Sequence, residues 1–96
     1  MAAIDLAPEV GDDFDRIIDH LLEHEVTEAT DRIDEIVGAL SILEGNPLIG
    51  RSTTGDLREL VIGQRSKGYV ALYKFVAEID TVFILAIRAQ KEAGYK

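Results

Sequence analysis

Six side chains in the C-terminal half of this 96-residue sequence could act together on a phosphate or another anion. Cleavage of RNA without a metal ion requires a base for the 2′-hydroxyl proton, cations for the pentacovalent phosphate and an acid for the leaving oxygen. Arginine, lysine and tyrosine can fill these roles, and the same residue types can bind a protein surface. The candidates are Arg58, Arg65, Lys67, Arg88, Lys91 and Tyr95.

A second pattern, earlier in the chain, is typical of a metal site. His20, Glu23 and His24 match H-x-x-E-H, in which two histidines four residues apart share one helix face and could hold zinc. No third ligand is evident, and the surrounding helix is acidic. We therefore interpret both histidines as solvent-facing side chains, and we expect neither a metal nor another cofactor.

The two halves of the chain differ sharply in charge. Residues 1–49 hold thirteen acidic and two basic side chains, a formal charge of −11, whereas residues 50–96 hold eight basic and five acidic ones, a charge of +3. The first half should repel phosphates. Any contact with nucleic acid or an acidic partner is therefore expected from the second half.

Composition favours one cytoplasmic domain over residues 1–96. The chain has no cysteine, which fits a reducing compartment. Its N-terminus lacks the basic flank and apolar stretch of a signal peptide. The longest uninterrupted apolar run, residues 82–87, is far too short to span a bilayer. We expect no membrane association.

The first half is expected to form a short strand and two antiparallel helices. Residues 2–6 read as the strand, and Pro8 suits the first turn of a helix that ends near residue 24 or 25. Thr27 is a candidate N-cap for the second helix, which Gly45 stops. Apolar residues at helical spacing give each helix one stripe. The stripes comprise Val10, Phe14, Ile17, Ile18, Leu21 and Leu22, then Ala29, Ile33, Ile36, Val37, Leu40 and Leu43.

The second half is expected to form three strands, at residues 57–62, 69–77 and 81–88, after a loop over residues 46–55. Turn-sized gaps make neighbouring strands antiparallel. Runs this apolar indicate strands with both faces largely covered. The prediction is an α+β fold in which a two-helix hairpin packs on a small, mostly antiparallel four-stranded sheet, in the order β-α-α-β-β-β. Tyr69, Tyr73 and Phe75 alternate on one strand and are expected in the core.

Three segments of the second half carry a family resemblance: LRELVIG at residues 57–63, GYVALY at 68–73 and LAIRAQKEAGY at 85–95. With these segments the chain resembles the RelE/ParE superfamily, the toxins of bacterial type II toxin–antitoxin pairs, also called plasmid-stabilisation proteins. The resemblance covers nearly the whole chain. It implies the same β-α-α-β-β-β order and growth inhibition that a cognate antitoxin neutralises.

The resemblance to the ribonuclease branch of the superfamily is partial at the residues that would do chemistry. Tyr95 falls at the position of that branch's C-terminal tyrosine, and Arg88 lies near its C-terminal arginine. The lysine positions on the first strand after the helices fall at about Val61 and Gly63, or at about Glu59 if the hairpin is longer, and neither choice gives a lysine. The next-strand arginine falls at Val70. Arg65 and Lys67 could substitute only if their hairpin folds back over the site.

The gyrase-poisoning branch lacks a complete ribonuclease set and shares the L-R-x-L-x-x-G pattern of residues 57–63. The resemblance therefore implies a toxin that binds and poisons a protein target such as DNA gyrase, through Arg58, Arg88, Lys91 and Tyr95. The alternative is a ribosome-dependent, metal-independent mRNA endonuclease that uses Arg58, Arg65, Lys67, Arg88 and Tyr95. The partner is a cognate antitoxin, and both a homodimer and a heterotetramer with the antitoxin remain open. A family member that has lost toxicity is the third reading.

Overall fold

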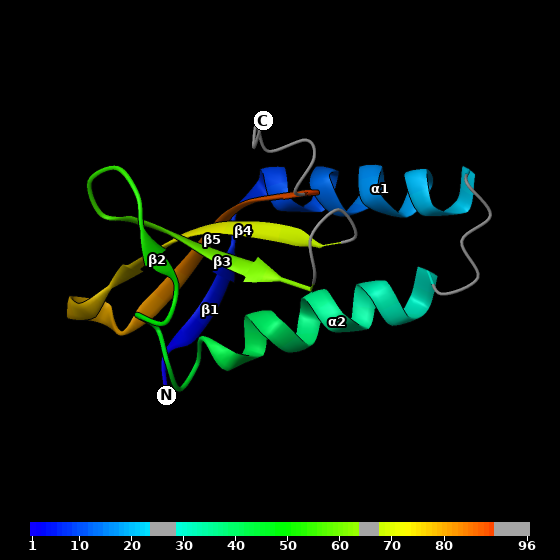
Figure 1. Ribbon diagram of the computed structural model, residues 1–96. Coiled ribbons are helices and arrows are strands. Elements are labelled where there is room, and N and C mark those ends of the chain that lie inside the picture. The colour runs from blue at the N-terminus through cyan, green and yellow to red at the C-terminus, as the bar shows by residue number, and fades with distance from the viewer. Residues whose placement is uncertain (24–28, 64–67, 90–96) are drawn as a thin grey trace.

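A computed structural model describes residues 1–23, 29–63 and 68–89 of the chain. Two helices lie on one side of a strongly twisted sheet, as Figure 1 shows. The elements in chain order are β1 (Ala3–Leu6), α1 (Pro8–Glu23), α2 (Ala29–Ile42), β2 (Arg51–Ser52), β3 (Leu57–Ile62), β4 (Tyr69–Val76), a 3₁₀ turn (Ala77–Ile79) and β5 (Thr81–Ala89). These elements confirm the predicted α+β fold. The end of α1 beyond Glu23 and the proposed Thr27 cap lie outside the described residues.

The described sheet has five strands, in the order β1-β5-β4-β3-β2, so the prediction of four was wrong by one. β1 pairs with β5 in parallel, and the other neighbours are antiparallel. The missed strand, β2, lies inside the expected loop. Its two residues are polar and exposed, so no apolar alternation marks them in the sequence. Pairing of Arg51 with Glu59 and of Ser52 with Arg58 makes this segment a strand.

The helices and one face of the sheet enclose the core. Alternate strand residues point to opposite faces, and directly paired residues share a face. The face toward the helices contributes Ile62, Tyr69, Ala71, Tyr73, Val82, Ile84 and Ile87, which cluster with Val10, Ile17 and Leu21 from α1 and with Ile36, Leu40 and Leu43 from α2. Full burial of one such aliphatic side chain stabilises the fold by about 1.5–3 kcal/mol relative to exposure.

Leu22 and Val37 belong to the predicted stripes but are exposed in the structure. Leu22 is 64% exposed and Val37 is 50% exposed, although both fall at helical spacing. Each follows a buried residue, Leu21 or Ile36, so each is turned by about 100° from the stripe. Tyr69 and Tyr73 are buried as expected, and Phe75 is partly buried against the core.

The opposite face of the sheet differs from the prediction that both faces are largely covered. Val70 is buried there, but its neighbours on the same face, including Leu72, Phe83 and Ala86, are only half-buried, and Val61 is 49% exposed. Both described helices lie on the other side. The apolar strands therefore pack against one helical layer rather than between two.

Candidate functional site

Arg88, near the end of β5, is bound to a buried carboxylate of α1. Asp13 is 4% exposed and belongs to the buried stripe of its helix, between Val10 and Ile17. Its carboxylate accepts hydrogen bonds from Nη1 of Arg88 and, at 3.2 Å, from Nη1 of Arg16. Two charge-assisted hydrogen bonds compensate the loss of hydration of the Asp13 carboxylate. The positive charge of Arg88 is therefore partly neutralised by Asp13 inside the fold.

The same cluster covers the open edge of β5. Strand β1 pairs with β5 only as far as Ile84, and no other described strand lies along the edge beyond this residue. Asp13 accepts the Ile87 N–H at 2.9 Å, and Nη2 of Arg16 donates to the Ile87 carbonyl oxygen at 3.4 Å. The two α1 side chains replace the hydrogen bonds that a strand would make. This part of the edge is thereby less available for strand addition.

Arg58, on β3, holds the loop between α2 and β2 against the sheet. Its Nη1 donates to the carbonyl oxygens of Gly50, at 2.7 Å, and Leu48, at 3.2 Å. The Gly50 N–H donates to the hydroxyl of the fully buried Tyr73 at 2.8 Å. A Cβ at Gly50 would lie 2.6 Å from that hydroxyl and 2.8 Å from the Glu59 carbonyl oxygen, so only glycine fits there.

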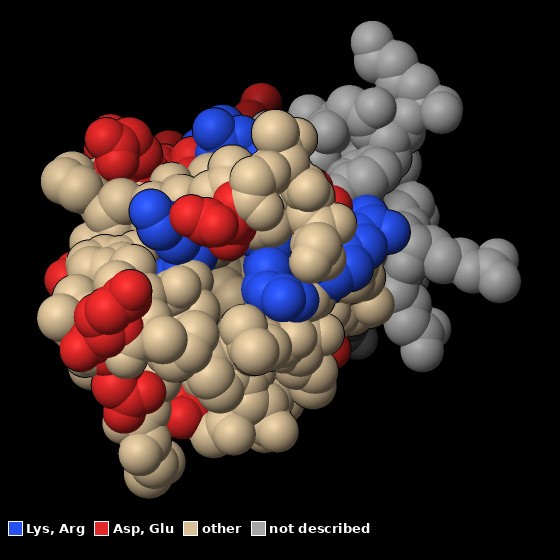
Figure 2. All heavy atoms as spheres, turned by 90° about the vertical axis from the view of Figure 1, so that its left-hand side faces the viewer, with Lys and Arg blue, Asp and Glu red and all other residues tan. Residues whose placement is uncertain are grey.

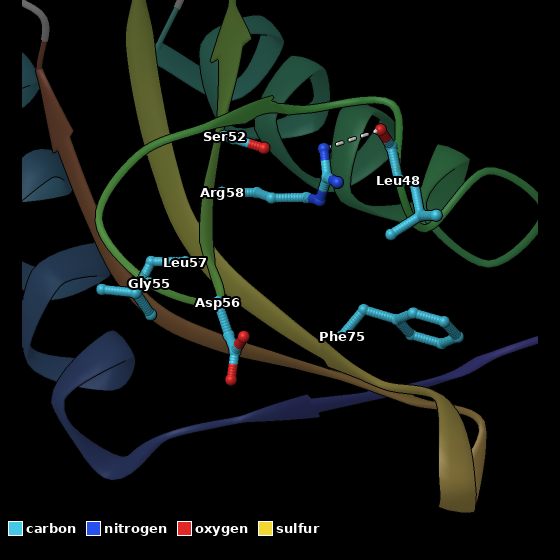
Figure 3. A pocket seen from close by; sticks show the side chains of 7 residues that line it. All are labelled: Leu48, Ser52, Gly55, Asp56, Leu57, Arg58 and Phe75. Carbon is cyan, nitrogen blue, oxygen red and sulfur yellow. Dashed lines mark hydrogen bonds between the residues drawn. The ribbon is translucent and has the colours of Figure 1, made fainter.

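A hollow of about 210 Å³ opens beside Arg58. Figure 3 shows its walls: Leu48 and Phe75 lie on one side, Ser52 lies above, and the Asp56 carboxylate points away from the guanidinium. All seven of its lining residues come from β2, β3, β4 and the loops beside β2. A cation beside apolar carbon is an arrangement that can orient an anionic group with a short apolar stem.

The strand register separates the two described candidate arginines. Arg58 pairs with Tyr73 and Arg88 with Val70, and residues three apart on β4 point to opposite faces of the sheet. Arg88 reaches Asp13 around the edge of β5. The structure therefore does not bring Arg58 and Arg88 into one cluster. Arg65, Lys67, Lys91 and Tyr95 lie outside the described residues, so their roles stay predictions.

Basic side chains on the end of the molecule that carries the β4–β5 turn are mixed with acidic ones. Figure 2 shows Lys and Arg side chains on this face, with Asp and Glu side chains between them. One ion pair between such residues joins Arg51 and Glu59, at 3.1 Å on the β2–β3 pair. The face seen in Figure 2 therefore carries both signs of charge.

The residues of the zinc-like pattern end α1. His20 and Glu23 are exposed on this helix, and His24 lies outside the described residues. Among residues 1–23, 29–63 and 68–89, no three acidic or histidine side chains gather in a way that could hold a metal ion. No helix within these ranges is both long and apolar enough to cross a membrane.

Sequence reasoning missed the role of Asp13. An acidic residue near the start of α1 is explained by the helix dipole, so its second role, as a buried residue of the apolar stripe, was overlooked. Asp13 falls three residues after Val10 and four before Ile17, which is the spacing of the buried stripe. An acidic residue in an apolar stripe requires a partner, because an unpaired buried charge is costly. That signal was present in the sequence.

Comparison with known proteins gives one family and several similar structures. Residues 4–94 match the model of the ParE toxin of the type II toxin–antitoxin system parDE. No curated protein sequence matches the chain.

The fold is similar to three solved toxin–antitoxin structures. A chain of the chromosomal ParDE system from P. aeruginosa has a TM-score of 0.74 and 21% identity, over 93% of this chain and 96% of that one. A chain of the intact E. coli RelBE complex gives 0.61 and 19%, over 92% and 95%. A chain of the archaeal RelE–RelB complex from Pyrococcus horikoshii OT3 gives 0.59 and 16%, over 99% and 98%. At these identities the likeness concerns the fold.

Proposed function

This chain belongs to the family of ParE toxins of type II toxin–antitoxin systems, and we propose that it acts by binding and poisoning a protein target, with DNA gyrase as the first candidate. In this proposal the protein works in the cytoplasm, needs no cofactor and cuts no RNA. Target contact involves its C-terminal half, through Arg58, Arg88, Lys91 and Tyr95.

The observation that supports binding over RNA cleavage is how the described arginines are used. Arg58 donates to two backbone carbonyl groups, and Arg88 is paired with the buried Asp13. Positions 61, 63 and 70, which would carry cations in a ribonuclease, hold Val61, Gly63 and Val70. Loss of one donor to a transition-state anion typically costs about 10²–10³ in rate. A binding surface tolerates such losses, because it depends on complementarity and a few anchors.

An antitoxin partner is part of the same proposal. Two of the similar structures are described as complexes of a toxin with its antitoxin. Large apolar side chains lie exposed on both described helices of this chain, where a partner could cover them. They include Leu22 at 64%, Val37 at 50% and Ile42 at 51% exposure. A segment of the antitoxin lying along these helices would remove them from water.

The experiment is induction of the protein in cells, followed by two parallel measurements. Primer extension on cellular transcripts reports RNA cleavage, and a supercoiling assay with purified gyrase reports poisoning. We expect inhibited supercoiling and no codon-positioned cuts. Arg88→Ala should weaken toxicity, whereas Tyr95→Phe should leave it nearly unchanged. Codon-positioned cuts that disappear in Tyr95→Phe, with supercoiling unaffected, would instead establish the mRNA endonuclease.

The matched control for the substitutions is Arg51→Ala. Arg51 is an exposed arginine on β2 that forms an ion pair with Glu59 and is not among the residues assigned to the target. Its loss removes the same charge as the loss of Arg88. Toxicity that falls equally in both variants would indicate an effect of net charge and would contradict a specific contact by Arg88.

A further inference from the structure

The guanidinium of Arg58 uses one of its three nitrogen atoms for hydrogen bonds to the described residues. That nitrogen is Nη1, which donates to the carbonyl oxygens of Leu48 and Gly50. Within the described residues, no hydrogen bond or ion pair involves Nε or Nη2 of Arg58. These two nitrogens form the edge of the guanidinium that binds a planar carboxylate with two parallel hydrogen bonds. Both acceptors on the occupied side are neutral, and Arg58 has no ion pair with the described residues, whereas Arg88 is paired with Asp13.

The surroundings of this edge suit a carboxylate carried on carbon. Figure 3 shows the guanidinium directed into the space between Leu48 and Phe75, so apolar carbon stands next to the free donors. The Ser52 hydroxyl, exposed on β2, adds a possible donor. Asp56 is the one acidic residue in the lining, and its carboxylate points away. The hollow has a volume of about 210 Å³, which is room enough for the end of one side chain.

We propose that this hollow binds the carboxylate of a glutamate or aspartate side chain in the antitoxin, with the stem of that side chain against Leu48 and Phe75. The identification of the partner rests on the proposed function, whereas the carboxylate site itself does not. In this site, recognition of the partner depends on the same contacts that hold the loop in place. The same guanidinium that receives the partner's carboxylate fixes the loop that forms one wall, so the donors are already positioned before the partner arrives.

The first test uses the free protein and a small probe. Sodium benzoate carries a carboxylate on an apolar ring and fits the volume, and benzyl alcohol is its neutral counterpart. In a ¹H–¹⁵N NMR titration, we expect saturable shifts of the Ser52 and Gly55 amides and of Arg58 Nε–H, with a dissociation constant of about 1–10 mM. Benzyl alcohol should bind at least tenfold more weakly. Shifts that are absent, or that occur elsewhere on the protein, would overturn the site.

Substitutions separate the fork of Arg58 from its charge and from its structural role. Arg58→Lys keeps the charge and can still donate to the carbonyl groups, but it lacks the planar fork, so benzoate binding should weaken at least tenfold while the melting temperature changes little. Ser52→Ala should weaken binding by two- to fivefold with no effect on folding. Arg51→Lys on the neighbouring strand is the control and should bind as the parent does. Equal binding by the Arg58→Lys and Arg51→Lys variants would contradict the proposal.

Inorganic phosphate tests the competing ligand class. Phosphate that binds this hollow more tightly than benzoate, by the same NMR shifts, would overturn the carboxylate assignment in favour of a nucleic-acid backbone contact. We expect phosphate to bind more weakly, because its oxygens would gain nothing from Leu48 and Phe75.

The second test concerns the partner. The toxin is produced together with its cognate antitoxin and purified as a complex, and dissociation is followed by surface plasmon resonance. We expect Ser52→Ala to speed dissociation by two- to fivefold and Arg58→Lys by tenfold or more. Unchanged dissociation, with benzoate binding lost, would overturn the antitoxin assignment alone. Failure of any antitoxin to copurify would contradict the proposed function, whereas the benzoate result would stand.

Discussion

Arg58 on β3 and Arg88 on β5 are both half-buried arginines of one sheet, yet their guanidinium groups bind different kinds of acceptor. Arg88 binds the buried carboxylate of Asp13, so its charge is balanced within the chain. Arg58 binds two neutral carbonyl oxygens and retains its charge. The first arrangement joins a helix to a sheet edge. The second joins a loop to a strand and leaves donors facing a hollow.

The difference shows that the position of a cation in a family motif does not decide whether the cation is available to a ligand. Arg88 aligns better with a position that carries function in the ribonuclease branch, but its first partner is internal. Arg58 matches no cation position of that branch, and it is the better placed of the two to receive an anion. Four substitutions test this contrast, in order of the size of the expected effect.

The largest effect is expected from Asp13→Ala, which removes the carboxylate that Arg88 binds. The change leaves the Ile87 N–H without its acceptor and Arg88 without its partner, so the free energy of unfolding should fall by about 3 kcal/mol. Urea denaturation measures it. Asp12→Ala removes the same charge from an exposed neighbour and should cost less than about 0.5 kcal/mol. Equal losses in the two variants would mean that the Asp13 cluster does not stabilise the fold.

Gly50→Ala disturbs the contacts of Arg58, because it pushes the loop between α2 and β2 away from the sheet. The added Cβ would meet the Tyr73 hydroxyl and the Glu59 carbonyl, and we expect a loss of about 2 kcal/mol from this overpacking. The comparison is Gly45→Ala, because nothing lies within 4 Å of a Cβ at Gly45. Thermal unfolding followed by circular dichroism compares both with the parent. A Gly50→Ala variant as stable as the Gly45→Ala variant would refute the close contact.

Tyr73→Phe sharpens the comparison by removing one oxygen atom from the loop anchor. The Gly50 N–H then loses its acceptor in a buried place, and stability should fall by about 1 kcal/mol. The hydrogen bond from Arg58 to the Gly50 carbonyl remains, so the loop stays near the sheet. Tyr69→Phe is the matched control, since its hydroxyl makes no hydrogen bond with the described residues. An equal loss in both variants, by urea denaturation, would count against the anchor.

The smallest effect is expected from Arg16→Ala, at the rim of the Asp13 cluster. The Arg16 side chain is 42% exposed, and its hydrogen bond to the Ile87 carbonyl is long, at 3.4 Å. The substitution should cost about 0.5 kcal/mol at low ionic strength. In 1 M NaCl the cost should shrink, because salt screens exposed charges. A cost that does not change with salt would show that packing, rather than charge, holds Arg16 in place.

The sequence predicts the regular elements well where apolar residues repeat. Residues 57–62 match β3 completely, and the ends of β4 and β5 differ from the predicted ones by one residue each. β2 could not be predicted in this way. It forms where the chain after α2 is held at Gly50 by Tyr73, 23 residues away, and by Arg58, eight residues away.

The candidate site was less accessible from the sequence than the fold. Residue type predicts that Arg58 and Arg88 carry charge, but not that one pairs with a buried acid and the other with carbonyl groups. Register decides this, because it places the two residues on opposite faces of the sheet. The exception is Asp13. Its spacing within the apolar stripe of α1 predicts that its carboxylate is buried with a partner, but not which residue that partner is.

The pairing of β1 with β5 has a kinetic consequence. Strand β5 lies between β1 and β4, so the first and last described strands are neighbours. The contact between Asp13 and Ile87 joins residues 74 positions apart in the chain. Contacts of such long sequence separation close late, because a large loop must first lose its conformational freedom. During synthesis, β1 and α1 therefore stay without their β5 partners until residues 81–87 have been made.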